Sequence, residues 1–338
     1  MNDTLQATGI VQEEKLLWEK GKKGKIGYSM PKQDVETATI SPDLIRDELD
    51  LPDLSEVDVI RHYTRLSQWN YGLDTGMYPL GSCTMKYNPK TNDRQASLPG
   101  FTRSHPMLPV ECAQGTLRLM VELEQQLAEI TGMAATSLQP AAGAHGELAG
   151  MLIFDAYHKS RNSKRTKIII PDTAHGTNPA SASLCGYQAV SVRSGEDGVL
   201  HPEQVRELMD EETAGIMVTN PNTVGMFENH IVEIAEIVHE KGGLVYADGA
   251  NMNAIMGIVK PGKIGVDVIH LNLHKTFSTP HGGGGPGAGP VCVVEELKPF
   301  LPVPRIVKSG ESYQLSEEYP LSIGKLHAFY GNVGVLIR

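Results

Sequence analysis

The sequence lacks long apolar runs and carries few basic residues. No stretch of its 338 residues approaches the roughly 20 apolar residues that a membrane-spanning helix needs. The opening M-N-D-T-L-Q-A-T-G lacks the basic and apolar regions of a signal peptide. The 30 basic residues are outnumbered by 40 acidic ones, and the formal net charge is −10. This balance argues against nucleic acid or an anionic membrane as a partner.

Cysteine is also scarce. The four cysteines are scattered and show neither CxxC nor the spacing of metal ligands, so we interpret them as reduced thiols of a cytoplasmic protein. No G-x-G-x-x-G follows a first strand, which argues against a Rossmann dinucleotide site. Apolar residues make up 40% of the chain, enough for the core of one large domain or two ordinary ones.

Residues 1–100 have an irregular pattern and are expected to form an N-terminal arm with a subunit-contact segment. Within them, residues 59–70 resemble a short helix. Residues 78–90, Y-P-L-G-S-C-T-M-K-Y-N-P-K, are rich in turn formers and too apolar for a linker. We expect an ordered loop packed on the core, and the alternative is a loop that lines a site or a subunit contact.

Residues 101–310 have the regular pattern of a large α/β domain. Two helices are expected first, at 115–130 and from the small-residue turn at 141–146 to about 159. Strands and helices then alternate, which indicates a mostly parallel sheet covered by helices. We expect strands at 166–171, 189–193, 214–219, 244–247, 266–273 and 291–294, and helices at 180–185, 201–209 and 228–241.

Polar residues follow four of these strands. His175 comes after the first, Asn222 and Thr223 after the third, Asp248 after the fourth and Lys275 after the fifth. Ligands of such sheets bind beyond the carboxyl ends of the strands, so these groups are expected at one edge. Burial at a strand end is costly for an ammonium group, and enzymes use such lysines as amines that condense with carbonyls.

Pyridoxal 5′-phosphate is a cofactor that needs such a set. It takes a lysine for its aldehyde, an acid for its pyridine nitrogen and an anion pocket for its phosphate. Lys275 and Asp248 would supply the first two, and His175 would stack on the ring. Either Asn222 or Thr223 would bond to the ring hydroxyl. The predicted cofactor-binding residues are Ala144, His145 and Gly146 at a helix start for the phosphate, with His175, Asn222, Thr223, Asp248, Ala250, His274 and Lys275.

Six stretches carry a family resemblance, and they occur in the family's order. They are P-L-G-S-C-T-M-K-Y-N, L-Q-P-A-A-G-A-H-G-E, P-D-T-A-H-G-T-N-P-A, T-N-P-N-T-V-G-M-F-E, Y-A-D-G-A-N-M-N-A-I-M-G and H-L-N-L-H-K-T-F-S-T-P-H-G-G-G-G-P-G. Together they resemble glycine dehydrogenase (decarboxylating), the P-protein of the glycine cleavage system, and specifically subunit 2 of its two-subunit versions.

The resemblance implies the aspartate-aminotransferase fold of pyridoxal-phosphate enzymes (fold type I). It implies that Lys275 bonds to the cofactor, that Asp248 partners the pyridinium and that His175 stacks on the ring. The implied reaction decarboxylates glycine and passes the aminomethyl group to the lipoyl arm of the H-protein. The implied partners are P-protein subunit 1, with two copies of each subunit, and the lipoylated H-protein.

Several points stay open on the sequence. The family's subunit 2 continues into a smaller C-terminal domain, so residues 311–338 are expected to be the start of a truncated domain. The alternatives are another fold-type-I enzyme, of aldolase or hydroxymethyltransferase type, and a non-catalytic scaffold subunit. His175, His274 and His281 are the candidates for proton transfer. The glycine run at 282–287 either approaches the cofactor or a partner closely, or is a tight strand connection.

Overall fold

The computed structural model describes residues 13–70, 72–76, 78–80, 83–279 and 287–338. They divide into two compact units, here called the N-terminal unit (up to residue 76) and the main unit (from residue 77), and each is described by itself. Among the described helices, none is long and apolar enough to cross a bilayer.

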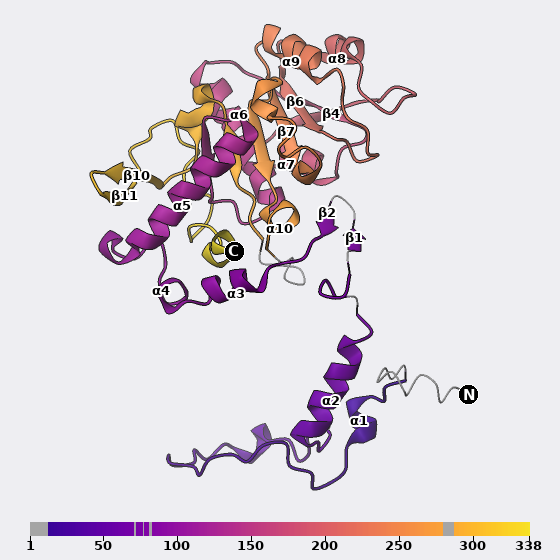
Figure 1. The fold of residues 1–338 in the computed structure, drawn as a ribbon, viewed down its shortest axis with the longest axis vertical. Helices are drawn as coiled ribbons and strands as arrows, with labels where there is room; N and C mark the ends of the chain where they lie inside the picture. The colour runs from indigo at the N-terminus through magenta and orange to yellow at the C-terminus, as the bar shows by residue number, and fades with distance from the viewer. Residues whose placement is uncertain (1–12, 71, 77, 81–82, 280–286) are drawn as a thin grey trace. The chain divides into compact units, whose positions relative to one another are not determined.

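The N-terminal unit contains α1 (Leu17–Lys20), a 3-10 turn η2 (Pro42–Leu44) and α2 (Glu56–Ser67) (Figure 1). Helix α2 starts three residues earlier than the pattern predicted because Ser55 and Asp58 form a capping box. The Ser55 hydroxyl accepts from the Asp58 N–H, and the Asp58 carboxylate accepts from the Ser55 N–H, both at 3.2 Å. No apolar residue is buried in the described part of this unit.

The main unit is built on a seven-stranded sheet with the order β3-β9-β8-β7-β6-β4-β5. The five strands from β8 to β5 are parallel, and β9 and β3 add antiparallel pairs at the other edge. The strands are β3 (Ala135–Ser137), β4 (Lys167–Pro171), β5 (Gln188–Val192), β6 (Thr213–Thr219), β7 (Leu244–Gly249), β8 (Val268–Leu271) and β9 (Val291–Val293). The predicted mostly parallel sheet is therefore confirmed.

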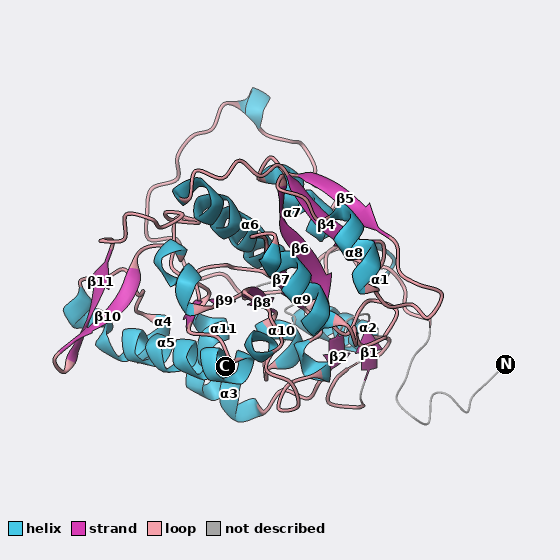
Figure 2. Cartoon of the chain, turned by 90° about the horizontal axis from the view of Figure 1, so that it is seen from above, coloured by secondary structure: helices cyan, strands magenta, loops and turns pink. Residues whose placement is uncertain are grey.

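Helices cover both faces of this sheet. One face packs on α5, α8 and α9 and the other on α6 and α7, and alternate residues of a strand point to opposite faces: Val245 into the first core, Tyr246 into the second. Figure 2 shows β8 and β9 between α5 and α6. The helices are α5 (Val110–Thr131), α6 (Gly143–Ser160), α7 (Thr177–Leu184), α8 (Pro202–Leu208) and α9 (Ile231–Glu240).

Smaller elements complete the main unit. β1 (Tyr78–Leu80) pairs antiparallel with β2 (Cys83–Met85), and β10 (Arg305–Ser309) pairs with β11 (Ser312–Ser316). Three short helices, α3 (Lys90–Ala96), α4 (Pro99–Thr102) and α11 (Val333–Ile337), lie outside the large sheet. The one-turn helix α10 (Leu273–Thr276) follows β8 directly. The fifth predicted strand therefore ends earlier than expected, because Asn272 already occupies the position before the first residue of α10.

Two glycines let α6 approach the sheet closely. A Cβ at Gly146 would lie 2.6 Å from the Gly289 carbonyl oxygen and 2.8 Å from the His270 Cβ. A Cβ at Gly150, one turn further, would overlap the ring of Tyr246. These contacts are too short for any side chain, so only glycine allows α6 to lie directly on β7 and β8.

Candidate active site

A cavity of about 220 Å³ lies at the carboxyl ends of the parallel strands. It brings together residues that the sequence predicted from five separate segments, and it adds several that the sequence did not single out. The lining residues are Gly143, Ala144, Glu147, His175, Thr177, Thr219, Thr223, Asp248, Ala250, Asn272, His274 and Lys275.

Asp248 ends the buried strand β7 and is 4% exposed. Its two carboxylate oxygens accept separate hydrogen bonds, one from the main-chain N–H of Ala250 at 2.9 Å and one from the Asn178 side chain at 3.1 Å. Burial by itself would raise the pKa of Asp248, but His270, these two donors and Lys275 together bring it below the ordinary value. Asp248 is therefore an ionised carboxylate in a site that is almost completely shielded from solvent.

Lys275 is half-buried on α10, and its main-chain N–H bonds to the Asn272 carbonyl at 3.0 Å. Strands β7 and β8 are paired, so Asp248 at the end of β7 and Lys275 on the helix that follows β8 lie at one edge of the sheet, as predicted. Lys86, just after β2, donates at 2.6 Å to the main-chain carbonyls of both His274 and Thr279. The segment at 78–90 thus contacts the main chain beside Lys275.

His175 and Thr223 line the mouth of the cavity. His175 is exposed, and its Nδ1 lies 2.7 Å from the Thr177 hydroxyl. The Thr223 hydroxyl donates to the Thr173 carbonyl. Asn222 does not line the cavity, because its amide donates at 2.8 Å to both Gly198 and Glu228. Of the two candidates for the ring hydroxyl, the geometry favours Thr223, and the role of either residue stays a prediction.

The start of α6 lies at the same cavity and offers main-chain N–H groups. The N-cap residue, Ala142, has no side chain that could cap the helix, and Gly143 and Ala144 line the cavity. Such a helix start favours a phosphate. The His145 ring turns away to accept from the Ala141 N–H at 3.2 Å, and Gly146 serves the packing of α6. Phosphate binding by these residues stays a prediction; His281 and residues 282–286 lie outside the described residues.

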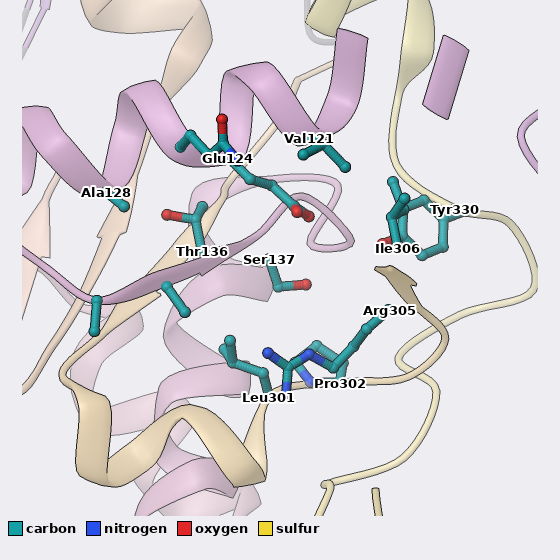
Figure 3. A pocket seen from close by; sticks show the side chains of 13 residues that line it. Val121, Glu124, Ala128, Thr136, Ser137, Leu301, Pro302, Arg305, Ile306 and Tyr330 are labelled. Atoms are coloured by element: carbon teal, nitrogen blue, oxygen red, sulfur yellow. The ribbon is translucent and has the colours of Figure 1, made fainter. Parts of the chain in front are cut away.

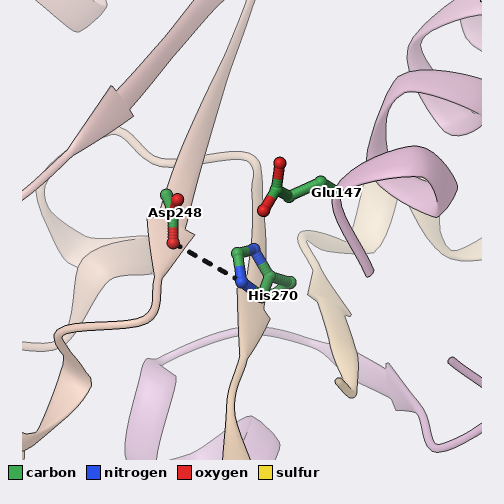
Figure 4. A group of neighbouring side chains, drawn as sticks. All are labelled: Glu147, Asp248 and His270. Atoms are coloured by element: carbon green, nitrogen blue, oxygen red, sulfur yellow. Dashed lines mark ion pairs between the residues drawn. The ribbon is translucent and has the colours of Figure 1, made fainter. Parts of the chain in front are cut away.

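Sequence reasoning missed a buried polar network behind Asp248. Glu147 on α6 accepts from the Thr177 hydroxyl at 2.8 Å and from Asn178 at 3.0 Å, so the Asn178 amide joins Glu147 to Asp248. On the other side, His270 presents its Nε2 to the Asp248 Oδ1 at 3.4 Å (Figure 4). In the sequence, His270 is a polar residue within the mostly apolar stretch 266–273, and this is the signal that could have pointed to the network.

A second cavity, of about 200 Å³, lies between α5, β3 and β10 (Figure 3), and it shares no lining residue with the first. The Glu124 carboxyl points into it, opposite Arg305 and near Tyr330. Burial raises the pKa of Glu124 to about 8, although Arg305 and the Leu138 N–H oppose the shift. It holds no lysine, so it lacks the amine that the predicted cofactor needs.

The cavity with Lys275 fits pyridoxal phosphate on the chemistry of its donors. It has a lysine amine, an ionised acid, a histidine at the mouth and an uncapped helix start in one place. Two buried side-chain oxygens in its lining, Thr219 Oγ1 and Asn272 Oδ1, have no hydrogen-bonding partner among the described residues. Unsatisfied buried polar atoms are rare in proteins, and a polar ligand would satisfy them.

Comparison with known proteins identifies related sequences. The family model described as "Glycine cleavage system P-protein" matches residues 34–323. A protein of Caldanaerobacter subterraneus subsp. tengcongensis named "Probable glycine dehydrogenase (decarboxylating) subunit 2" is 58% identical over 329 residues, which is 96% of this chain and 68% of the relative. A protein with the same name from Alkaliphilus oremlandii is 57% identical over 330 residues, with the same two coverages.

Solved structures agree on the fold. A crystal structure of glycine decarboxylase (P-protein) of the glycine cleavage system, in inhibitor-bound form, matches with a TM-score of 0.70 at 19% identity, over 88% of this chain and 69% of that one. A crystal structure of Oryza sativa TDC with PLP and tryptamine matches with a TM-score of 0.55 at 14% identity, over 74% of this chain and 57% of that one. The predicted fold, that of fold-type-I pyridoxal-phosphate enzymes, is confirmed.

Proposed function

The chain belongs to the glycine cleavage system P-protein family, and we propose that it acts as subunit 2 of a glycine dehydrogenase (aminomethyl-transferring). In this reaction, glycine loses its carboxyl group as CO2 and the aminomethyl group passes to the lipoyl arm of the H-protein. The observation that carries the proposal is the meeting of Lys275 and Asp248 in one cavity with the open start of α6. We also propose a cytoplasmic location, based on the scattered cysteines.

When bound, pyridoxal phosphate supplies an electron sink for the electron pair that CO2 leaves behind. The residues of the chain would prepare it for that role. Lys275 would hold the cofactor by its aldehyde and give way to the glycine amine. Asp248, ionised and buried, would keep the proton on the pyridine nitrogen, because a carboxylate in a dry place interacts strongly with a neighbouring cation.

Three further residues would position the reactants. The main-chain N–H groups of Gly143 and Ala144 would bind the cofactor phosphate at the start of α6. His175, exposed at the mouth, would cover one face of the ring. His175 and His274 both line the cavity, and with His281 they stay the candidates for proton transfer.

A partner subunit is part of the proposal. The names of the relatives imply a subunit 1, and we propose an assembly with two copies of each subunit. The N-terminal unit supports it, because its large apolar side chains are exposed instead of buried. Six of the most exposed are Ile26, Tyr28, Met30, Val35, Leu44 and Leu51. Ordering such a chain has an entropy cost that burial against a partner would offset, and we assign that surface to subunit 1.

Bicarbonate exchange tests the function. The chain is incubated with pyridoxal phosphate, glycine, subunit 1, lipoylated H-protein and labelled bicarbonate, and label in the glycine carboxyl is measured. We expect incorporation, and a sharp loss when subunit 1 or the H-protein is omitted. An absence of label in the complete mixture would refute the proposal.

The alternatives give different results in the same mixture. An aldolase or hydroxymethyltransferase would act on β-hydroxy amino acids and would leave the glycine carboxyl unlabelled. A scaffold subunit would support exchange even after Lys275→Ala, because the chemistry would then lie elsewhere. The presence of both Lys275 and Asp248 in one cavity favours the catalytic role over the scaffold.

A further inference from the structure

The side chain of Asp248 is backed by a buried pair that the mechanism above does not use. Tyr246 lies two residues before Asp248 on β7, and His270 is the register partner of Asp248 on β8. Both residues are 0% exposed. The Tyr246 hydroxyl lies 2.5 Å from the His270 Nδ1, and the other ring nitrogen of His270 faces Asp248.

The Tyr246 hydroxyl is a donor in this arrangement. Burial raises its pKa well above 10, and the charges of Asp248 and Glu147 act in the same direction. A hydroxyl that stays protonated can donate a hydrogen bond, and the His270 Nδ1 is the one described acceptor within reach. Nδ1 then accepts, so the ring proton of His270 is placed on Nε2.

The proton on Nε2 faces the carboxylate. Nε2 has no hydrogen-bonding partner within the described part of the chain and lies 3.4 Å from Asp248 Oδ1. In the opposite tautomer, the Nε2 lone pair would point at a negative oxygen, which is repulsive. Beside the hydrogen bonds from Ala250 and Asn178, the Nε2–H of His270 therefore makes a third, longer electrostatic contact with the Asp248 carboxylate.

We propose that Tyr246 and His270 are positioning residues for Asp248. The Tyr246 hydroxyl fixes the tautomer of His270 that carries its proton on Nε2, and this Nε2–H orients and stabilises the Asp248 carboxylate. The consequence for the cofactor rests on the proposed function, whereas the tautomer does not. Helix α6 supports the pairing independently. Gly146 faces the His270 Cβ and Gly150 faces the Tyr246 ring, so the space for both rings exists because α6 has no side chain at either position.

A metal ion is the other chemistry that this cluster offers. One ligand atom from each of Glu147, Asp248 and His270 lies within 4.8 Å of the others. Both carboxylates already accept hydrogen bonds from Asn178, and the Tyr246 hydroxyl occupies the His270 Nδ1. Hydrogen bonds therefore account for the cluster better than an ion does.

Tyr246→Phe is the test, because it removes only the hydroxyl. The matched control is Tyr187→Phe, a tyrosine 5% exposed in the same core that lines no part of the cavity. Nitrogen NMR of histidine-labelled protein without cofactor reports the tautomer of each ring, and loss of one signal in His270→Gln assigns it. We expect Nδ1 unprotonated and Nε2 protonated for His270 in the wild type, and mixed tautomers in Tyr246→Phe alone.

Kinetics supply the second readout. With cofactor and the complete exchange mixture, we expect Tyr246→Phe to lower kcat on the order of tenfold with little change in KM, and Tyr187→Phe to leave both unchanged. His270→Gln keeps an N–H donor and should retain more activity than His270→Ala. A wild-type His270 with its proton on Nδ1 or on both nitrogens, an unchanged tautomer in Tyr246→Phe, or a stoichiometric metal ion that EDTA removes would overturn the proposal. A wild type with the expected tautomer but no exchange would refute the proposed function alone.

Discussion

Asp248→Asn is the substitution that separates cofactor binding from cofactor chemistry. The two Asp248 oxygens accept from different donors, the Ala250 N–H at 2.9 Å and the Asn178 amide at 3.1 Å. An asparagine has one oxygen, so its NH2 group must face one donor whichever way the amide is turned. We expect a loss of about 1–3 kcal/mol in the free energy of unfolding from that mismatch.

The loss in chemistry should be much larger. A neutral amide cannot hold the proton on the pyridine nitrogen as a carboxylate does. Each pKa unit lost there corresponds to about 1.4 kcal/mol, which is a factor of about ten in rate. We therefore expect exchange to fall by several powers of ten while the phosphate site and Lys275 still bind the cofactor.

The assay compares bicarbonate exchange at equal cofactor occupancy, which visible absorbance measures. Asp172→Asn is the matched control: Asp172 follows β4, two strands away from β7 in the sheet, is exposed, and accepts hydrogen bonds from Ser194 outside the cavity. It should retain exchange. Near-normal exchange in cofactor-loaded Asp248→Asn would refute the role given to Asp248.

Three further substitutions follow from other contacts. Burial lowers the pKa of His158 from 6.5 to about 4, so between these two pH values the unfolded chain binds a proton on His158 and the folded chain does not. The free energy of unfolding should therefore fall by roughly 3 kcal/mol as the pH drops from 6.5 to 4. Calorimetry should find a smaller fall in His158→Gln. The pKa of Glu124 is raised from 4.5 to about 8, so ionisation of its buried carboxyl destabilises the folded state as the pH rises. At a pH above 8, Glu124→Gln should therefore have a higher Tm than the wild type, and an equal Tm would contradict this. Lys86→Met removes two bonds beside Lys275, and cofactor titration should show about tenfold weaker binding; equal affinity would exclude that support.

The sequence predicts this site well where a strand end determines position. Lys275 and Asp248 each follow an apolar run, and parallel strands bring their carboxyl ends to one edge, so their proximity is predictable without coordinates. The direction of a side chain is harder to predict. His145 and Asn222 are near the cavity in sequence, but their side chains bond to Ala141, Gly198 and Glu228 instead.

The network behind Asp248 could not be predicted in the same way. Its members come from α6, α7, β7 and β8, and what brings them together is the close approach of α6. That approach depends on Gly146 and Gly150, which in a sequence look like any small residues in a helix. The antiparallel strands β3 and β9 have three residues each; the predicted 291–294 corresponds to β9, whereas β3 was missed because so short a run has no clear period.

The most direct test of the account is the site of cofactor attachment. The chain is loaded with pyridoxal phosphate, reduced with borohydride and digested, and the labelled peptide is sequenced by mass spectrometry. The account predicts one modified residue, Lys275, in the peptide containing H-L-N-L-H-K-T-F, and no visible cofactor band in Lys275→Ala. A modified lysine other than Lys275, or an unchanged band in Lys275→Ala, would contradict it.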